Sequence, residues 1–221
     1  MDKQKFSVAI LISGTGSNLK TLIEARASGR LDLDICHVVT NRARASGLDH
    51  ARAAGIPYSV FDAENTGNGP QQDLAIAECL REFEPDLVIL SGYMRIIGAG
   101  LVSPFSGRMI NQHPSLLPLY PGLDTYRRVL EAGDAEHGAS VHFVTEELDA
   151  GPLVSQVRIP VLPEETPETL AARLGPIEHR LLVASVELFA RGRVKMSHDK
   201  ALLDDKVLQR PLLLQDDDRF A

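Results

Sequence analysis

Short apolar runs alternate with helical stretches along the first half of the chain. Phe6–Ile12 is a continuous, partly β-branched run of the kind found in strands that are buried on both faces. Similar runs follow at Ile35–Thr40 and Leu87–Ser91, and the stretches Leu19–Ala27 and Gln71–Phe83 have helical spacing. This β-α-β rhythm predicts a parallel sheet with right-handed crossovers.

The helix expected over Gln71–Phe83 has Leu74, Ala77 and Leu80 as its buried stripe. In the second half, the alternating pattern of Leu153–Pro160 predicts a strand antiparallel to its neighbour. A glycine and a proline at 175–176 are expected to separate two helices, because proline lacks the amide hydrogen that helices need. A terminal hairpin is expected near residues 201–208, followed by a frayed, charged tail over residues 215–221.

These elements predict an α/β fold: an open, mostly parallel, Rossmann-like sheet with helices on both faces and a small antiparallel C-terminal extension. The chain has 221 residues, which suits one such domain. Its formal charge of −7 argues against a general nucleic-acid or membrane-surface binder. Two cysteines form no disulfide framework, and no apolar run approaches the length of a membrane span. We therefore expect a soluble, cytoplasmic protein.

A polar triplet ends the apolar run that precedes Pro114. The residue before a proline favours extended geometry, so Asn111 and His113 should lie on one face of a strand end. An amide and an imidazole on a common face suit a reaction that develops an oxyanion and moves a proton. Asp149 follows on a turn-like Leu-Asp-Ala-Gly-Pro segment and could orient the histidine. Taken singly, each piece also fits an ordinary strand end or turn.

A glycine-containing loop joins the first strand to the first helix. It reads Ser-Gly-Thr-Gly-Ser-Asn and includes Gly16, Ser17 and Asn18. Such a turn before a helix N-terminus can bind an anion through backbone amides. The loop matches neither GxGxxG, because Leu19 replaces the third glycine, nor the Walker A pattern. By spacing alone, phosphate binding and a plain tight turn fit equally well.

Apolar residues surround one arginine just after the run Leu87–Ser91: Met94, Arg95, Ile96 and Ile97. Open α/β sheets bind ligands at the carboxyl edge of their strands, so this segment could form a ligand wall. A core pair with a snorkelling arginine fits the pattern equally well.

Together these segments resemble the 10-formyltetrahydrofolate-dependent formyltransferases. The pieces that carry the resemblance are Ile-Asn-x-His-Pro-Ser-Leu-Leu-Pro, Tyr-Pro-Gly-Leu, Leu-Glu-Ala-Gly-Asp, Glu-His-Gly, Ser-Val-His-Phe-Val-Thr and Leu-Asp-x-Gly-Pro. The resemblance extends from about residue 6 to about residue 210 and is strongest to members that act on glycinamide ribonucleotide. It implies transfer of a formyl group from 10-formyltetrahydrofolate, as co-substrate, to the amine of that ribonucleotide in purine biosynthesis. It also implies direct transfer without a metal.

The resemblance assigns roles by position. Asn111, His113 and Asp149 match the catalytic set, and the loop Gly16, Ser17 and Asn18 matches the part that holds the ribose phosphate. Glu178 matches an acid that contacts the substrate, although an acid favoured by the helix dipole fits its position equally well. Met94, Arg95, Ile96 and Ile97, together with Asn111, match the folate pocket. His142 is expected to be a supporting group near the site.

The resemblance implies one formyltransferase domain over residues 1–221. Its parts are a phosphate-binding βαβ half at 1–100, a catalytic and folate-binding half at 101–210, and a tail at 211–221. A monomer and a homodimer both remain compatible with it.

The chain departs from the family at three places. Asp124 and Tyr126 stand where members commonly have histidines, and no arginine lies between Arg52 and Arg81, where members often carry one. Three other functions remain open. A formyltetrahydrofolate deformylase uses water as acceptor but usually carries an added N-terminal domain. A non-catalytic nucleotide- or folate-binding module would not need all three polar residues. Sugar-nucleotide and tRNA formyltransferases share the signature but typically need further segments.

Overall fold

The computed structural model describes residues 5–221 and divides the chain into two compact units. The first unit ends at Asn111 and the second begins at Gln112, so the division falls inside the strand β5 (Met109–His113). The four residues before Lys5 lie outside the described part. The expectation of one domain over residues 1–221, with its halves at 1–100 and 101–210, stays a prediction.

The first unit is built on a parallel sheet. Its strands are β1 (Phe6–Ile12), β2 (Leu33–Thr40), β3 (Tyr58–Val60), β4 (Leu87–Leu90) and the first three residues of β5. Hydrogen-bonded pairing runs β5-β4-β1-β2-β3, and every pair is parallel. Val8–Ile12 and all of β4 are buried, as expected for strands covered on both faces.

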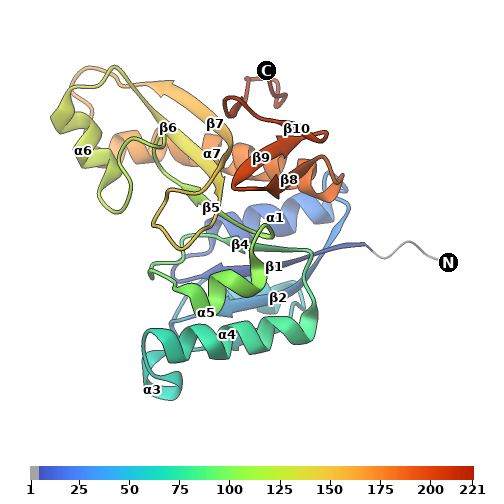
Figure 1. Ribbon diagram of the computed structural model, residues 1–221. Helices are drawn as coiled ribbons and strands as arrows, with labels where there is room; N and C mark the ends of the chain where they lie inside the picture. The colour runs from blue at the N-terminus through green and yellow to red at the C-terminus, as the bar shows by residue number, and fades with distance from the viewer. Residues whose placement is uncertain (1–4) are drawn as a thin grey trace. The chain divides into compact units, whose positions relative to one another are not determined.

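Helices cover both faces of this sheet, with α1 and α4 on opposite sides of β1 and β2 (Figure 1). Their bounds are α1 (Ser17–Ala27), α2 (Leu48–Ala53), α3 (Ala63–Thr66), α4 (Pro70–Phe83) and α5 (Ala99–Val102), followed by the 3₁₀ turn η1 (Ser103–Phe105). The predicted stripe of α4 is wrong at one position. Leu74 is 53% exposed, whereas Asp73 is buried beside Ile76 and Leu80. Asp73 occupies the inward position because the largely buried Arg95 pairs with it.

The second unit combines one long helix with antiparallel strands. It contains α6 (Thr125–Ala132), β6 (Glu136–Phe143), β7 (Leu153–Pro160), α7 (Pro167–Ala190), β8 (Val194–Ser197), β9 (Lys200–Leu203), β10 (Lys206–Val207) and β11 (Leu212–Leu213). β7 pairs antiparallel with β6 and parallel with β11. The separate sheet β8-β9-β10 is the predicted antiparallel extension. The predicted fold class is therefore confirmed.

The predicted break at residues 175–176 is wrong, because α7 runs without interruption from Pro167 to Ala190 with Pro176 inside it. Proline lacks an amide hydrogen, so the carbonyl of Ala172, four residues earlier, loses its usual helical donor. Ala172 and Pro176 are both exposed, so water can bond to that carbonyl. Buried residues on both sides of it, from Leu170 to Phe189, pack the helix against β6 and β7. This packing outweighs the local preference of proline.

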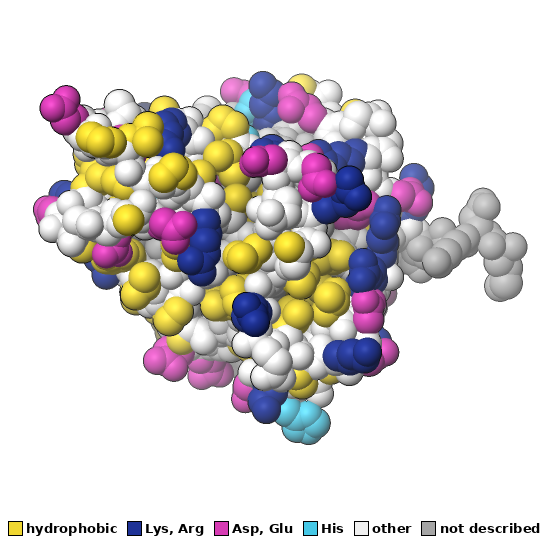
Figure 2. All heavy atoms as spheres, turned by 90° about the horizontal axis from the view of Figure 1, so that it is seen from above, with side chains coloured by type: hydrophobic (Ala, Val, Ile, Leu, Met, Phe, Trp, Pro, Cys, Tyr) yellow, Lys and Arg dark blue, Asp and Glu magenta, His cyan; other side chains and the backbone are white. Residues whose placement is uncertain are grey.

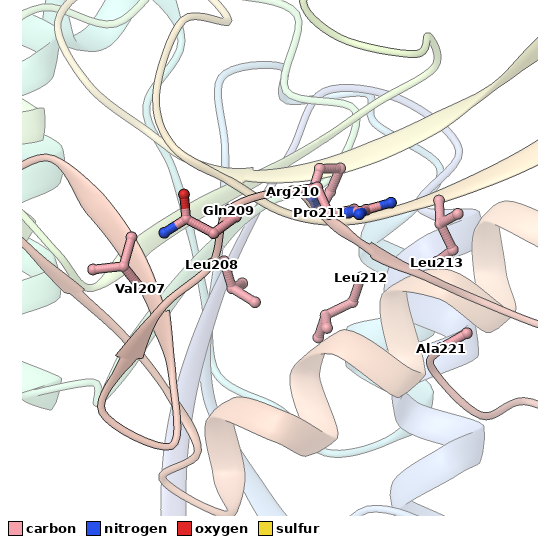
Figure 3. A pocket seen from close by; sticks show the side chains of 8 residues that line it. All are labelled: Val207, Leu208, Gln209, Arg210, Pro211, Leu212, Leu213 and Ala221. Carbon is pink, nitrogen blue, oxygen red and sulfur yellow. The ribbon is translucent and has the colours of Figure 1, made fainter.

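The predicted fraying of the C-terminal tail is also wrong. The Gln215 amide donates to the Arg219 carbonyl, and Leu214 forms a bridge with Phe220. From α7, Arg180 pairs with Asp218 and donates to the carbonyls of Gln215 and Asp216. An open hollow of about 410 Å³ beside this tail is lined by residues 207–213 and Ala221, and none of the predicted site residues lines it (Figure 3).

Candidate active site

The loop after β1 requires glycine at its centre. Gly16 has a φ of +67°, and a Cβ there would meet the Gly47 Cα at 2.8 Å. Both the left-handed backbone and this close approach exclude larger residues. α1 begins at Ser17, so Ser17 and Asn18 form its first turn, which contains no acidic residue. The loop has the geometry of a helix N-terminus that can receive an anion.

Ser13 joins three loops at the carboxyl edge of this sheet. Its hydroxyl accepts a hydrogen bond from the Met94 amide at 2.8 Å and donates to Asn41 Oδ1 at 2.6 Å. The Gly47 amide donates to the Gly14 carbonyl at 3.0 Å. Ser13 therefore links the glycine-containing loop after β1 directly to Met94, the first residue of the segment predicted to contact folate.

The segment Met94–Ile97 divides into outward and inward side chains. Met94 and Ile96 are 62% and 70% exposed, whereas Ile97 is buried in the core. Arg95 pairs with buried Asp73 through both terminal nitrogens and donates to the Gly69 carbonyl. Asp73 also accepts the Gly98 amide at 2.8 Å. The apolar side chains of Met94 and Ile96 are therefore the ones available to a ligand, and Asp73 fixes both ends of the segment.

Asn111 and His113 both lie on β5, as predicted. Asn111 is opposite Leu90 of β4 and is half-buried, and His113 is 6% exposed at the end of the strand. Residues two apart on a strand point to the same face, so the amide and the imidazole share a face of β5. Gln112 points to the other face and donates from Nε2 to the Glu178 carbonyl at 2.5 Å.

The second unit brings His113 and Asp149 together. The His113 Nδ1 lies 3.4 Å from Asp149 Oδ2, and both side chains are 7% exposed. The same Oδ2 accepts the Gly122 amide at 2.9 Å. The other ring nitrogen, Nε2, lies 2.9 Å from the Tyr120 carbonyl. Because carboxylate and carbonyl are both acceptors, an imidazolium would satisfy both contacts, whereas a neutral ring would satisfy one.

His142 lies on the other side of Asp149, as predicted for a supporting group. Its Nε2 is 3.6 Å from Asp149 Oδ1, and its Nδ1 is 2.9 Å from the Phe143 carbonyl. Burial lowers the pKa of His142 below its ordinary value, against the opposing effect of the Asp149 charge. His142 is therefore neutral near pH 7, and Nδ1 donates to the carbonyl.

Glu178 lies about halfway along α7 and contacts Tyr126 of α6. The Tyr126 hydroxyl donates to Glu178 Oε1 at 3.2 Å. Burial raises the pKa of Glu178 to about 7, and the tyrosine hydrogen bond opposes that rise. Burial also raises the pKa of Tyr126, with a further contribution from the negative charge of Glu178. The proton therefore stays on the tyrosine.

Several residues of the site have no local sequence signal. Tyr126 and Glu178 are separated by 52 positions, and Arg95 and Asp73 by 22. The Tyr120 and Gly122 contacts use backbone atoms, which any residue type carries. Only the fold brings these pairs together, whereas an acidic residue near the start of α4 is also apparent from the sequence.

The described part of the chain contains neither a cluster of possible metal ligands nor a membrane-spanning helix. Within residues 5–221, no cluster of three or more His, Cys, Asp or Glu side chains is arranged to hold a metal ion. Among the helices of the same range, none offers an apolar stretch that could span a membrane.

On the face shown in Figure 2, lysine and arginine side chains are interspersed with acidic ones. An anion that binds on this face would therefore be held by a few neighbouring groups and not by an extended basic surface.

A buried imidazole–carboxylate pair such as His113 and Asp149 is able to move a proton, which suits an enzyme that catalyses group transfer. The chain belongs to the Formyl transferase family, whose model matches residues 6–186. The resemblance seen in the sequence is thereby confirmed.

Known proteins of this family match nearly the whole chain. A phosphoribosylglycinamide formyltransferase of Haemophilus influenzae is 42% identical over 203 residues, which are 92% of this chain and 96% of the relative. The structure of a phosphoribosylglycinamide formyltransferase from Coxiella burnetii has a TM-score of 0.88 and 42% identity, covering 93% of this chain and 96% of the other. A formyltetrahydrofolate deformylase from Pseudomonas syringae is 25% identical with a TM-score of 0.83; the match covers 91% of this chain and 66% of the deformylase.

Proposed function

We propose that the protein transfers a formyl group from 10-formyltetrahydrofolate to the amine of glycinamide ribonucleotide, a step of purine biosynthesis. The observation that carries this function is the match, over nearly their full length, to relatives named for this activity. The buried contact of His113 with Asp149 supplies the acid–base group that formyl transfer needs.

In the proposed reaction, the substrate amine attacks the formyl carbon directly. A new carbon–nitrogen bond forms, the bond from the formyl carbon to folate N10 breaks, and one proton passes from the amine to N10. Asn111 donates a hydrogen bond to the developing oxyanion, a contribution of about 3–4 kcal/mol for such donors. His113, as imidazolium, stabilises the same charge and relays the proton, and Asp149 orients the ring and balances its charge.

The carbonyl of Tyr120 has a consequence for this step. It occupies the Nε2 side of His113 at 2.9 Å, while Nδ1 faces Asp149. Nε2 must therefore leave the Tyr120 carbonyl before it can contact the reacting groups. The loop that carries Tyr120 has to yield this contact when the substrates bind.

Binding is assigned to residues away from the bond that breaks. Gly16, Ser17 and Asn18 hold the substrate phosphate at the N-terminus of α1, and Glu178 accepts hydrogen bonds from another part of the ribonucleotide. Met94 and Ile96 offer apolar side chains to the folate, whereas Arg95 and Ile97 shape the backbone of that wall. Fixing the substrates at both ends positions the amine against the formyl carbon.

We also infer a cytoplasmic location, since Cys36 and Cys79 are both free thiols and a reducing compartment keeps them so. Folate and the ribonucleotide are the expected partners.

Hydrolysis of the formyl folate is the competing function, because a deformylase has the same fold. It is the weaker candidate because the identity to that protein is 25%, against 42% for the transferases. The test is absorbance-monitored release of tetrahydrofolate from the formyl donor, with and without glycinamide ribonucleotide. Release that requires the ribonucleotide is expected. Equal release without it would establish the hydrolase, and no release in either case would favour a binding module.

A further inference from the structure

A half-buried tyrosine, Tyr126, contacts the carboxylate that the proposed function assigns to substrate binding. The Tyr126 hydroxyl lies 3.2 Å from Glu178 Oε1. The tyrosine ring packs edge-on against His137 of β6, with ring centroids 5.2 Å apart. His137 is 1% exposed, so the tyrosine ring packs against a residue of the core of the second unit.

The backbone of Glu178 is fixed independently. Gln112 donates to the Glu178 carbonyl, and Gln112 precedes His113 on β5. The position of the Glu178 main chain is thereby tied to the strand that carries the catalytic imidazole. Only the side-chain torsions of Glu178 then remain free to rotate, and the hydrogen bond from the Tyr126 hydroxyl fixes the direction of one carboxylate oxygen.

Among the described residues, Tyr126 is the side chain that donates a hydrogen bond to the Glu178 carboxylate. His137 is neutral near pH 7, because burial and then the charge of His113 lower its pKa to about 4. Charged groups on the elements packed against α7 have other partners: Arg127 with Asp124 and Glu131, Arg128 with the carbonyls of Pro121 and Leu123, Arg158 with Glu136, and Lys195 with Asp205. The neutral His142 lies against Asp149.

We propose that Tyr126 is a positioning residue for glycinamide ribonucleotide, because its hydroxyl orients the Glu178 carboxylate and favours its charged form. The inference rests on the proposed function and deepens it. A buried carboxyl group without a donor would more readily take up a proton, and a neutral carboxyl group has one acceptor oxygen fewer for a substrate hydroxyl or amine. Tyr126 therefore acts on substrate affinity through Glu178 and not on the bond-making step.

The test is Tyr126→Phe, which removes one oxygen and keeps the ring against His137. Loss of the hydroxyl shifts Glu178 further toward its neutral form, so KM for the ribonucleotide should rise about tenfold at pH 6.5. The rise should be smaller at pH 9, where the carboxylate is charged in both proteins. kcat and KM for the formyl folate should stay within about twofold. The acid limb of kcat/KM for the ribonucleotide should move to higher pH. Tyr58→Phe, which removes a hydroxyl that accepts a hydrogen bond from Arg52, is the matched control and should change none of these values.

A cycle with Glu178→Gln separates positioning from a general loss of structure. If Tyr126 acts through Glu178, adding Tyr126→Phe to the glutamine variant should leave KM unchanged within about twofold. An unchanged KM in Tyr126→Phe, or equal effects in both backgrounds, overturns the inference while the transferase function stands. Absence of ribonucleotide-dependent turnover in the wild type overturns the proposed function and the inference with it.

Discussion

Replacing Asp149 by asparagine removes one negative charge and keeps the shape of the side chain. The amide oxygen of the new side chain can still accept the Gly122 amide, which bonds Asp149 Oδ2 at 2.9 Å in the wild type. The change therefore tests the charge beside His113 more than the loop around it. If the proposed mechanism is right, the variant loses stabilisation of the imidazolium in the transition state.

The magnitude follows from the distance between the two groups. Unit charges at 3.4 Å, the separation of His113 Nδ1 and Asp149 Oδ2, interact by about 5 kcal/mol at an effective dielectric constant of about 20. Part of this energy returns when the neutral amide reorients, so we expect a loss of about 3–4 kcal/mol. At about 1.4 kcal/mol for each factor of ten, kcat should fall by two to three orders of magnitude.

Steady-state kinetics with both substrates measure this loss. KM for glycinamide ribonucleotide should change by less than about threefold, because we propose that the loop at Gly16, and not Asp149, holds the phosphate end. Asp205→Asn is the matched control, since it removes the same charge from a side chain that is 79% exposed. A kcat within threefold of wild type in Asp149→Asn would remove this carboxylate from the mechanism.

Three further variants test other parts of the account. Gly16→Ala should raise KM for the ribonucleotide, because the left-handed φ alone costs about 1–2 kcal/mol and the new Cβ meets Gly47; unchanged affinity would refute the phosphate loop. Asp73→Asn should raise KM for the folate and lower the free energy of unfolding by about 3 kcal/mol, because it leaves Arg95 without its buried partner; denaturant titration showing wild-type stability would contradict this. Burial raises the pKa of Glu178 from 4.5 to about 7, so the native state binds the proton more tightly than the unfolded state. Between those pH values wild type should therefore lose up to about 3 kcal/mol of stability relative to Glu178→Gln as pH rises, and parallel stability curves for the two proteins would exclude the shift.

Periodic patterns and local motifs predicted the sheet and the His113–Asp149 contact, because both depend on alternation and on strand ends. Features set by partners distant in sequence were missed. Asp73 takes a core position that the apolar pattern assigns to Leu74, since Arg95 forms an ion pair with it. Pro176 stays within α7 because flanking residues are packed, which no local preference reveals. Tyr126 was noticed as a departure from the family, but its contact with Glu178 required the fold.

Transfer of the formyl group to the ribonucleotide can be followed through the formyl carbon itself. The protein is incubated with a folate carrying a ¹³C-labelled 10-formyl group and with glycinamide ribonucleotide, and the products are separated by mass spectrometry. We expect the label to appear in the formylated ribonucleotide in equal amount to the tetrahydrofolate released. Label recovered as free formate would contradict this, because water would then be the acceptor.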